Sequence, residues 1–107
     1  WAVEPENAAI LSGGSVGTHL QMGIGDGLIP ENLNTTIYEH ICVISDAQAI
    51  ETAKRLASEE GIMCGISSGS NVAAAIKLAR RLGKGKTVVT VLPDTGERYF
   101  STVLFDD

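Results

Sequence analysis

The order of strand and helix patterns between Ile41 and Leu92 places the strongest constraint on how this chain can fold. Residues 41–44 form a short β-branched run, and residues 87–92 form a longer apolar run that suits a strand buried on both faces. Two helical patterns lie between them, separated by a very short strand candidate at residues 62–64. This β-α-β-α-β order predicts an α/β fold, with a mostly parallel sheet flanked by helices in three layers.

The first helical pattern carries signals at both of its ends. Ser45 and Gln48 have the spacing of a capping box, in which each side chain bonds the backbone of the other residue. Gly61 supplies the left-handed residue that commonly ends a helix. The sequence therefore predicts a helix between these signals, with an ion pair between Glu51 and Arg55 on its exposed side. Its apolar positions predict the buried face: Ile50, Ala53, Leu56 and Ala57.

The second helix is expected to follow the turn Gly65–Gly69 and to end at Gly83. Its apolar spacing predicts the face that packs on the sheet: Val72, Ala75, Ile76 and Ala79. Residues 6–36 are rich in Gly, Asn, Ser and Thr and are predicted to be mainly loop, with a short helix near residues 8–11. A further short helix is expected over residues 99–105.

Length and charge narrow the range of partners. The chain has 107 residues, enough for one modest core. Thirteen acidic residues against eight basic ones give a net charge of −5, which argues against a nucleic-acid surface because such surfaces need clustered Lys and Arg. No apolar run approaches the length that crosses a bilayer. The charge balance favours small molecules or protein partners over polyanions.

The two cysteines and the chain start indicate the setting of the protein. Cys42 and Cys64 have no CxxC spacing and lie in apolar runs, so we expect reduced core thiols in a cytoplasmic protein and no metal site. No secretory signal pattern is visible. Trp1–Pro5 resembles the end of a strand, so we expect the chain to be a piece of a longer protein.

A glycine-rich segment, Gly23-Ile24-Gly25-Asp26-Gly27, is the first candidate site. Glycine-rich turns can hold phosphates because bare backbone amides can approach the ligand. A dinucleotide fingerprint is excluded, because Leu28 stands where the third glycine is needed and Pro30 interrupts the helix that should follow. The segment is therefore either a tight turn that lets the backbone approach a ligand or an ordinary surface loop.

The turn Gly65–Gly69 is the second candidate site. It matches G-x-S-x-G between a strand and a helix, as in the nucleophile elbow of α/β-hydrolases. A hydrolase needs a histidine after the serine, but His19 and His40 both precede Ser67. The pattern weakens the hydrolase interpretation without excluding it.

Two other interpretations of this turn stay open. One of the serines at positions 67, 68 and 70 could simply cap the helix. Alternatively, a hydroxyl at the carboxyl end of a parallel strand could line a ligand crevice, together with the segment Leu92–Gly96.

Four segments, in this order along the chain, resemble the C-terminal portion of the cysteine synthase family, the O-acetylserine sulfhydrylases. These enzymes are fold-type II pyridoxal-phosphate enzymes, related to the tryptophan synthase β subunit. The matching segments are Ala2–Pro5, Gly23–Pro30, Glu60–Gly69 and Leu92–Tyr99. Because four motifs in family order are more specific than any one alone, residues 1–107 are identified as part of the large cofactor-binding domain of a two-domain enzyme.

The resemblance implies a role for several residues. Ser67 would hydrogen-bond the pyridine nitrogen of pyridoxal 5'-phosphate, and Pro93 would lie against the ring region. The backbone of Gly23, Ile24 and Gly25 would lie beside the cofactor and the substrate. The Schiff-base lysine and the phosphate loop of the family are expected before Trp1, so no catalytic residue is assigned within this chain.

The resemblance also implies an activity. The complete protein, expected to be a homodimer, would replace the acetate of O-acetylserine by sulfide to give cysteine, and this piece alone would be inactive. A related pyridoxal-phosphate lyase, such as cystathionine β-synthase or a serine or threonine dehydratase, remains an alternative. Two alternatives of other classes are a serine hydrolase with Ser67 as nucleophile and a non-enzymatic binding module.

Overall fold

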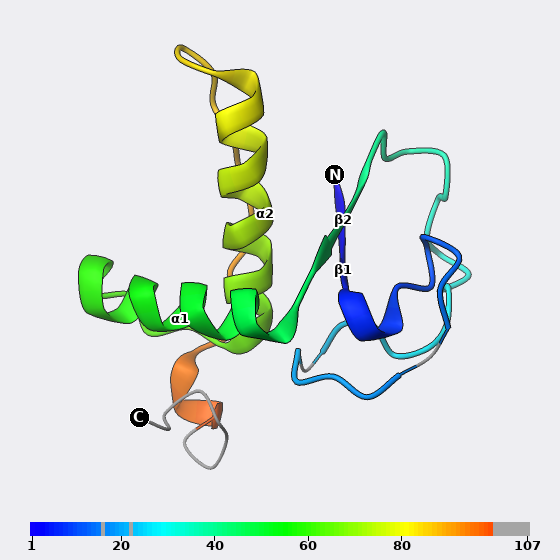
Figure 1. Cartoon of the computed structure of the whole chain (residues 1–107), viewed down its shortest axis with the longest axis horizontal. Helices are drawn as coiled ribbons and strands as arrows, with labels where there is room; N and C mark the ends of the chain where they lie inside the picture. The colour runs from blue at the N-terminus through cyan, green and yellow to red at the C-terminus, as the bar shows by residue number, and fades with distance from the viewer. Residues whose placement is uncertain (16, 22, 100–107) are drawn as a thin grey trace.

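The computed structural model describes residues 1–15, 17–21 and 23–99 (Figure 1). In chain order the elements are β1 (Ala2–Pro5), the 3-10 helix η1 (Glu6–Ala8), β2 (Ile41–Ile44), α1 (Asp46–Glu60), α2 (Ile66–Leu82) and the 3-10 helix η2 (Gly96–Tyr99). The α/β class is confirmed. The short helix expected near residues 8–11 is displaced: the 3-10 helix η1 ends at Ala8, and residues 9–11 are not helical. Most of the helix expected over residues 99–105 lies outside the described residues.

The two strands form a parallel sheet, in agreement with the predicted mostly parallel sheet. β1 pairs with β2 in a register that runs from Ala2 opposite Ile41 to Pro5 opposite Ile44. Figure 1 shows the two strands side by side, with the N-terminus at the start of β1. Alternate residues of β2, Cys42 and Ile44, are buried in the core. The strand predicted over residues 41–44 and the strand end predicted at the start of the chain are both confirmed.

The end signals of α1 act as predicted. The Ser45 hydroxyl accepts a hydrogen bond from the Gln48 backbone at 3.2 Å, and the Gln48 side chain accepts one from the Ser45 backbone at 3.1 Å. Gly61 ends the helix with a left-handed φ of 69°. The predicted ion pair is wrong in its partner, because Arg55 bonds Glu59 at 3.0 Å, one turn further along the helix. Both side chains of that pair are exposed, so its contribution to stability is small.

The two helices approach each other closely at Gly69. A Cβ atom at this position would overlap the carbonyl oxygen of Ala49 and would lie 3.0 Å from the backbone nitrogen of Ala53. Both alanines are buried, and Figure 1 shows α1 crossing the lower part of α2. Small residues on both helices therefore allow their backbones to pack together without intervening side chains.

This contact corrects the predicted helix faces. In α1 the predicted Ala53 is buried with Ala49, and the predicted Ile50 and Leu56 are partly buried against the core, whereas Ala57 is exposed. In α2 the buried face comprises Ile66, Ser67, Ser68, Gly69, Ser70 and Ala74. The predicted α2 face is wrong, because Ile76 and Ala79 are exposed and Val72 and Ala75 are only half-buried. The apolar spacing failed because the contact uses small and polar residues, which a hydrophobicity pattern does not count.

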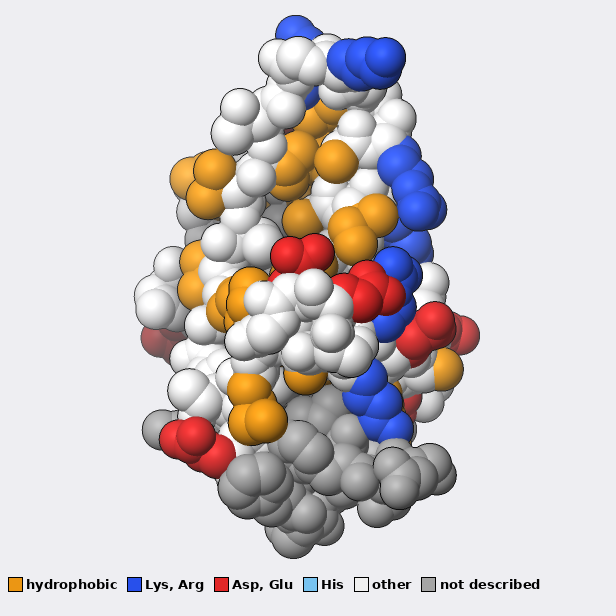
Figure 2. All heavy atoms as spheres, turned by 90° about the vertical axis from the view of Figure 1, so that its left-hand side faces the viewer, with side chains coloured by type: hydrophobic (Ala, Val, Ile, Leu, Met, Phe, Trp, Pro, Cys, Tyr) orange, Lys and Arg blue, Asp and Glu red, His pale blue; other side chains and the backbone are white. Residues whose placement is uncertain are grey.

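The strongest predicted strand, residues 87–92, is not a strand within the described residues. It runs extended along α2, where the Asn71 side chain donates a hydrogen bond to the Val91 carbonyl at 2.9 Å. Val89 is 86 % exposed and Val91 is 65 % exposed. Figure 2 shows apolar side chains gathered on the upper half of the face in view, where α2 lies in Figure 1. A strand buried on both faces needs neighbouring strands, which the described residues do not supply at this segment.

The short strand candidate at residues 62–64 is also corrected. Cys64 makes only an isolated antiparallel bridge to Thr95, instead of a strand of the parallel sheet. No helix within the described part of the chain has both the length and the apolar character needed to cross a membrane.

Replacing Gly69 with alanine tests the helix contact. Glycine-to-alanine changes in a helix interior normally stabilise by about 1 kcal/mol. Here the added methyl meets the Ala49 backbone, and overpacking of this kind costs about 1–3 kcal/mol. We therefore expect Gly69→Ala to lower the urea midpoint of the full-length protein.

The exposed Ala79 of the same helix provides the matched control. Ala79→Gly should lose only the propensity difference of about 1 kcal/mol. An unchanged or higher midpoint for Gly69→Ala would show that the two backbones do not approach closely at this position.

Candidate functional site

Ser67 lies in the first turn of α2 and is 3 % exposed. The N-cap of the helix is Gly65, and no side chain caps the first turn. Ser70 points its hydroxyl to the Gln21 side chain at 2.7 Å. The interpretation of these serines as helix caps is therefore wrong. Ser67 is thus a buried polar side chain at the start of α2 that does not cap the helix.

The segment that contains Pro93 adjoins the start of α2. The Gly65 backbone donates a hydrogen bond to the Asp94 carbonyl at 3.3 Å, and the Gly96 backbone donates one to the Met63 carbonyl at 3.2 Å. Only glycine fits at position 96 without a steric clash, because a Cβ atom there would lie 2.6 Å from the Met63 side chain. Pro93 itself is exposed. The structure therefore brings the predicted residues Ser67 and Pro93 to the same end of α2.

The glycine-rich segment forms a tight turn. The Ile24 backbone donates a hydrogen bond to the Gln21 carbonyl at 3.4 Å. Gly23 has a φ of +92° and Gly25 a φ of +65°, values that side chains other than glycine rarely adopt. A Cβ atom at Gly25 would also lie 2.6 Å from the Pro5 ring. Both glycines are thus needed for the backbone of this turn.

His19 holds the turn from one side. Its Nδ1 atom accepts a hydrogen bond from the Gln21 backbone at 3.1 Å, so in the neutral ring the proton lies on Nε2. Nε2 then donates to the Gly25 carbonyl at 3.0 Å. Because the ring is half-buried and both nitrogens have partners, this histidine is a structural clamp of the turn.

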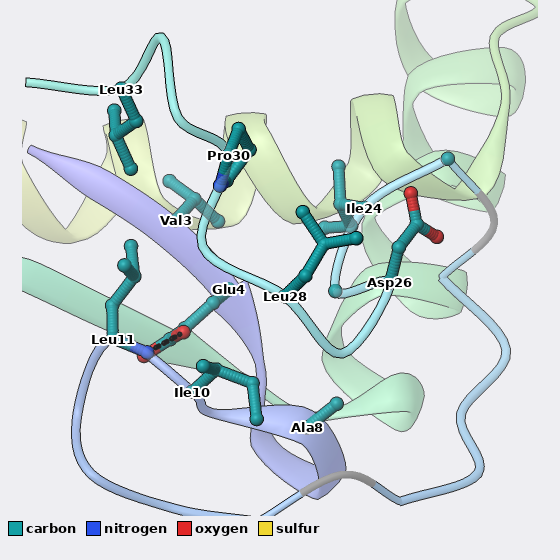
Figure 3. Close-up of a pocket in the computed structure, with 12 residues that line it drawn as sticks. Val3, Glu4, Ala8, Ile10, Leu11, Ile24, Asp26, Leu28, Pro30 and Leu33 are labelled. Carbon is teal, nitrogen blue, oxygen red and sulfur yellow. Dashed lines mark hydrogen bonds between the residues drawn. The ribbon is translucent and has the colours of Figure 1, made fainter.

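A cavity of about 250 Å³ lies between the turn and the sheet (Figure 3). Gly23, Ile24 and Gly25 line one wall, and residues of β1 and η1 line the other. The buried Glu4 carboxylate at its edge already accepts three hydrogen bonds, from the Leu11 backbone and from the backbone and hydroxyl of Ser12. Glu4 therefore anchors a loop, and the cavity is mainly apolar.

The predicted site residues thus form two groups, one at the cavity and one at the start of α2. Ser67 and Pro93 do not line the cavity. The side chain of Gln21 lies between the groups: it is fully buried and bonds Ser70 of α2 directly. Sequence patterns missed Gln21, because a polar residue in a loop gives no periodic signal of burial. Its place two residues before the first glycine of the turn was the only available indication.

Cys64 lies just before the Ser67 turn. Burial raises the pKa of its thiol, the charge of Asp94 adds to the increase, and a hydrogen bond with Ser68 partly opposes it. Thiols with a raised pKa stay protonated at neutral pH and are poor nucleophiles. Cys64 is therefore a packing residue.

Comparison with known proteins decides the family. The family described as "Pyridoxal-phosphate dependent enzyme" matches residues 1–94. The chain belongs to this family.

The similar proteins include cysteine synthases and a cystathionine beta-synthase. The chain is 56 % identical to a cysteine synthase of Staphylococcus aureus (strain Mu50) over 99 % of its own length and 35 % of that enzyme. It matches the structure of a cysteine synthase from Entamoeba histolytica with a TM-score of 0.95 and 40 % identity, over 99 % of this chain and 32 % of that one. An O-acetylserine-dependent cystathionine beta-synthase from Helicobacter pylori matches with a TM-score of 0.86 and 40 % identity, over 96 % and 33 %. The chain spans about a third of the length of these relatives.

The hydrolase interpretation gains no support in this pyridoxal-phosphate-family chain. His19 bonds Gly25 and Gln21, and His40 contacts Trp1 with ring centroids 4.3 Å apart and ring planes tilted by 45°. Among the residues that the structure describes, neither histidine is bonded to Ser67.

The environment of Cys64 predicts slow alkylation. In the folded full-length protein we expect N-ethylmaleimide to modify Cys64 far more slowly than in urea. Because the pKa is raised, the native rate should rise only at pH values above the ordinary thiol pKa of about 8.5. Peptide mapping by mass spectrometry measures both rates. Rapid modification of native Cys64 at neutral pH would contradict its burial and protonation.

Proposed function

We propose that the complete protein is a pyridoxal-phosphate-dependent cysteine synthase that replaces the acetate of O-acetylserine by sulfide. This chain would supply part of its large cofactor-binding domain. The identity of 56 % to the S. aureus cysteine synthase supports the activity. The observation that carries the role of this chain is the burial of the Ser67 side chain, 3 % exposed, at the start of α2.

The surroundings of Ser67 fit the pyridine nitrogen of the cofactor. When bound, pyridoxal phosphate supplies an electron sink for bond breaking at the substrate's α-carbon. The Ser67 hydroxyl is neutral and stands at the positive end of the α2 dipole, so it does not favour a full positive charge on the nitrogen. Such a partner tunes the sink to a milder strength than a carboxylate would, which suits elimination and replacement at the β-carbon.

The Gly23–Gly25 turn fits the substrate side of the site. Its glycines leave backbone groups uncovered, and Gly23 has open space around it. We assign Gly23, Ile24 and Gly25 to the substrate pocket, with Gly23 also near the cofactor, and Pro93 to the edge of the ring. The Schiff-base lysine is assigned to the part of the enzyme that this chain does not include.

The compartment and assembly follow the same proposal. Both cysteines are free and buried, which supports a reducing compartment such as the cytoplasm. We propose a homodimer by resemblance to the cysteine synthase family.

A second candidate is an O-acetylserine-dependent cystathionine β-synthase. The chain is as identical to the H. pylori enzyme, at 40 %, as to the E. histolytica cysteine synthase structure. The fold and the Ser67 turn would serve both reactions. The two differ in the nucleophile that the complete enzyme accepts.

Replacing Ser67 with alanine tests the cofactor contact. In the full-length enzyme, Ser67→Ala should change the absorption spectrum of bound cofactor and lower kcat by about 10-fold or more, because a hydrogen bond of about 1–3 kcal/mol is lost at the ring. The adjacent Ser68 is equally buried, and Ser68→Ala serves as the matched control. Equal spectra for wild type and Ser67→Ala would refute the assignment.

A nucleophile assay separates the two candidates. Full-length enzyme supplied with O-acetylserine should consume sulfide with a higher kcat/KM than homocysteine, as read by product chromatography. A preference for homocysteine would favour the second candidate, and turnover of neither would contradict both.

A further inference from the structure

The Gln21 side chain connects three separate elements through one amide group. Its nitrogen donates to the Ile44 carbonyl at 2.8 Å and to the Asp46 carboxylate at 3.0 Å. Its oxygen accepts from the Ser70 hydroxyl at 2.7 Å. These three partners lie at the end of β2, the start of α1 and the second turn of α2. Because two acceptors face the nitrogen and a donor faces the oxygen, the orientation of the amide is fixed.

The backbone of the same residue closes the glycine turn. The Gln21 carbonyl accepts from the Ile24 backbone at 3.4 Å, and its N–H donates to His19 at 3.1 Å. The preceding residue, Leu20, donates its backbone N–H to the second oxygen of Asp46 at 3.1 Å. Gln21, which precedes the Gly23–Gly25 turn, is thus attached to the helices by its own side chain and by the backbone of Leu20.

We propose that Gln21 is a positioning residue that fixes the Gly23–Gly25 turn relative to Ser67. Ser67 lies one helical turn before Ser70. A shift of the Gln21–Ser70 bond therefore moves the Gly23–Gly25 turn relative to the Ser67 hydroxyl, which faces the cofactor in the proposed site. The functional consequence rests on the proposed roles of Ser67 and the turn. The mechanical coupling rests only on the hydrogen bonds of Gln21.

The coupling depends on the amide and not on the bulk of the side chain. Gln21 is 0 % exposed, so water cannot replace its partners without opening the structure. A leucine of similar size would remove the bonds to the Ile44 carbonyl and the Asp46 carboxylate and would leave the Ser70 hydroxyl with only the Ile66 carbonyl as partner. Misplacement of a catalytic group by about 1 Å can lower a rate by about 100-fold.

The test compares Gln21→Leu and Gln21→Glu in the full-length enzyme. Both variants should raise KM for O-acetylserine and lower kcat, with kcat/KM reduced by about 10- to 100-fold. A variant that merely folded less well would reduce the active fraction and leave KM unchanged. Unchanged KM in both variants would overturn the proposal.

Gln21→Glu adds a pH signature. Its ionised carboxylate would face the Asp46 carboxylate and the Ile44 carbonyl, which only accept hydrogen bonds. Protonation of the introduced acid restores one donor, so kcat/KM relative to wild type should rise as the pH falls. A ratio to wild type that does not vary with pH would contradict the donor role of Gln21.

The Gln21→Glu/Asp46→Asn double variant exchanges donor and acceptor between the two residues. The asparagine can still accept from the Leu20 backbone with its oxygen and donate to the introduced carboxylate with its nitrogen. We expect the double variant to reverse at least part of the rise in KM that Gln21→Glu causes. If the effects of the two substitutions on KM were simply additive, the pairing of Gln21 with Asp46 would be overturned. Leu20→Ala, which keeps the backbone bond to Asp46, is the control and should keep the wild-type KM.

Hydrogen exchange of the cofactor-free enzyme separates this proposal from the proposed function. Gln21→Leu should increase amide exchange in residues 23–27 and in residues 66–70 together, whereas Leu20→Ala should change neither segment. Unchanged exchange in either segment would overturn the coupling. If wild-type enzyme bound no cofactor while both segments responded, the proposed function would fail and the coupling would stand.

Discussion

The close contact between α1 and the first turns of α2 determines where the other elements can lie. Gly69 allows the α2 backbone to approach Ala49 and Ala53, with no side chain of its own between them. Ser67, Ser68 and Ser70, in the same turns of α2, are buried as well. Burial makes each hydroxyl costly unless a partner satisfies it. The serine-rich turn can therefore persist only as part of a network or a ligand site.

The serines of this turn differ in their surroundings. Ser70 bonds Gln21, and Ser68 lies against the Cys64 thiol. Ser67 is nearly as buried as its neighbours. The same network that satisfies Ser70 also holds the glycine turn through Gln21. The bonds of Gln21 thus connect the glycine turn to the part of α2 that carries Ser67.

Local signals predicted the elements that depend on nearby residues. Ser45, Gln48 and Gly61 define α1 through bonds within four residues, and the structure contains all of them. Residues 87–92 failed as a strand, because strand formation depends on neighbouring strands and not on β propensity alone. The buried face of α2 failed for a related reason, since Gly69 and the serines pack by being small rather than by being apolar. The role of Gln21 could not be predicted from the sequence, because its three side-chain partners are 23 to 49 residues away in sequence.

The family resemblance was carried by motifs whose physical roles the structure explains only in part. The glycines of the Gly23–Gly25 turn are explained by positive φ angles and by the Pro5 ring. The role of Ser67 depends on a cofactor contact, which a crystal structure of the full-length enzyme with pyridoxal phosphate measures most directly. We predict a distance of about 2.7–3.2 Å between Ser67 Oγ and the pyridine nitrogen, within the hydrogen-bond range. A pyridine nitrogen bonded to a carboxylate, or lying beyond hydrogen-bond distance of Ser67, would contradict the assignment.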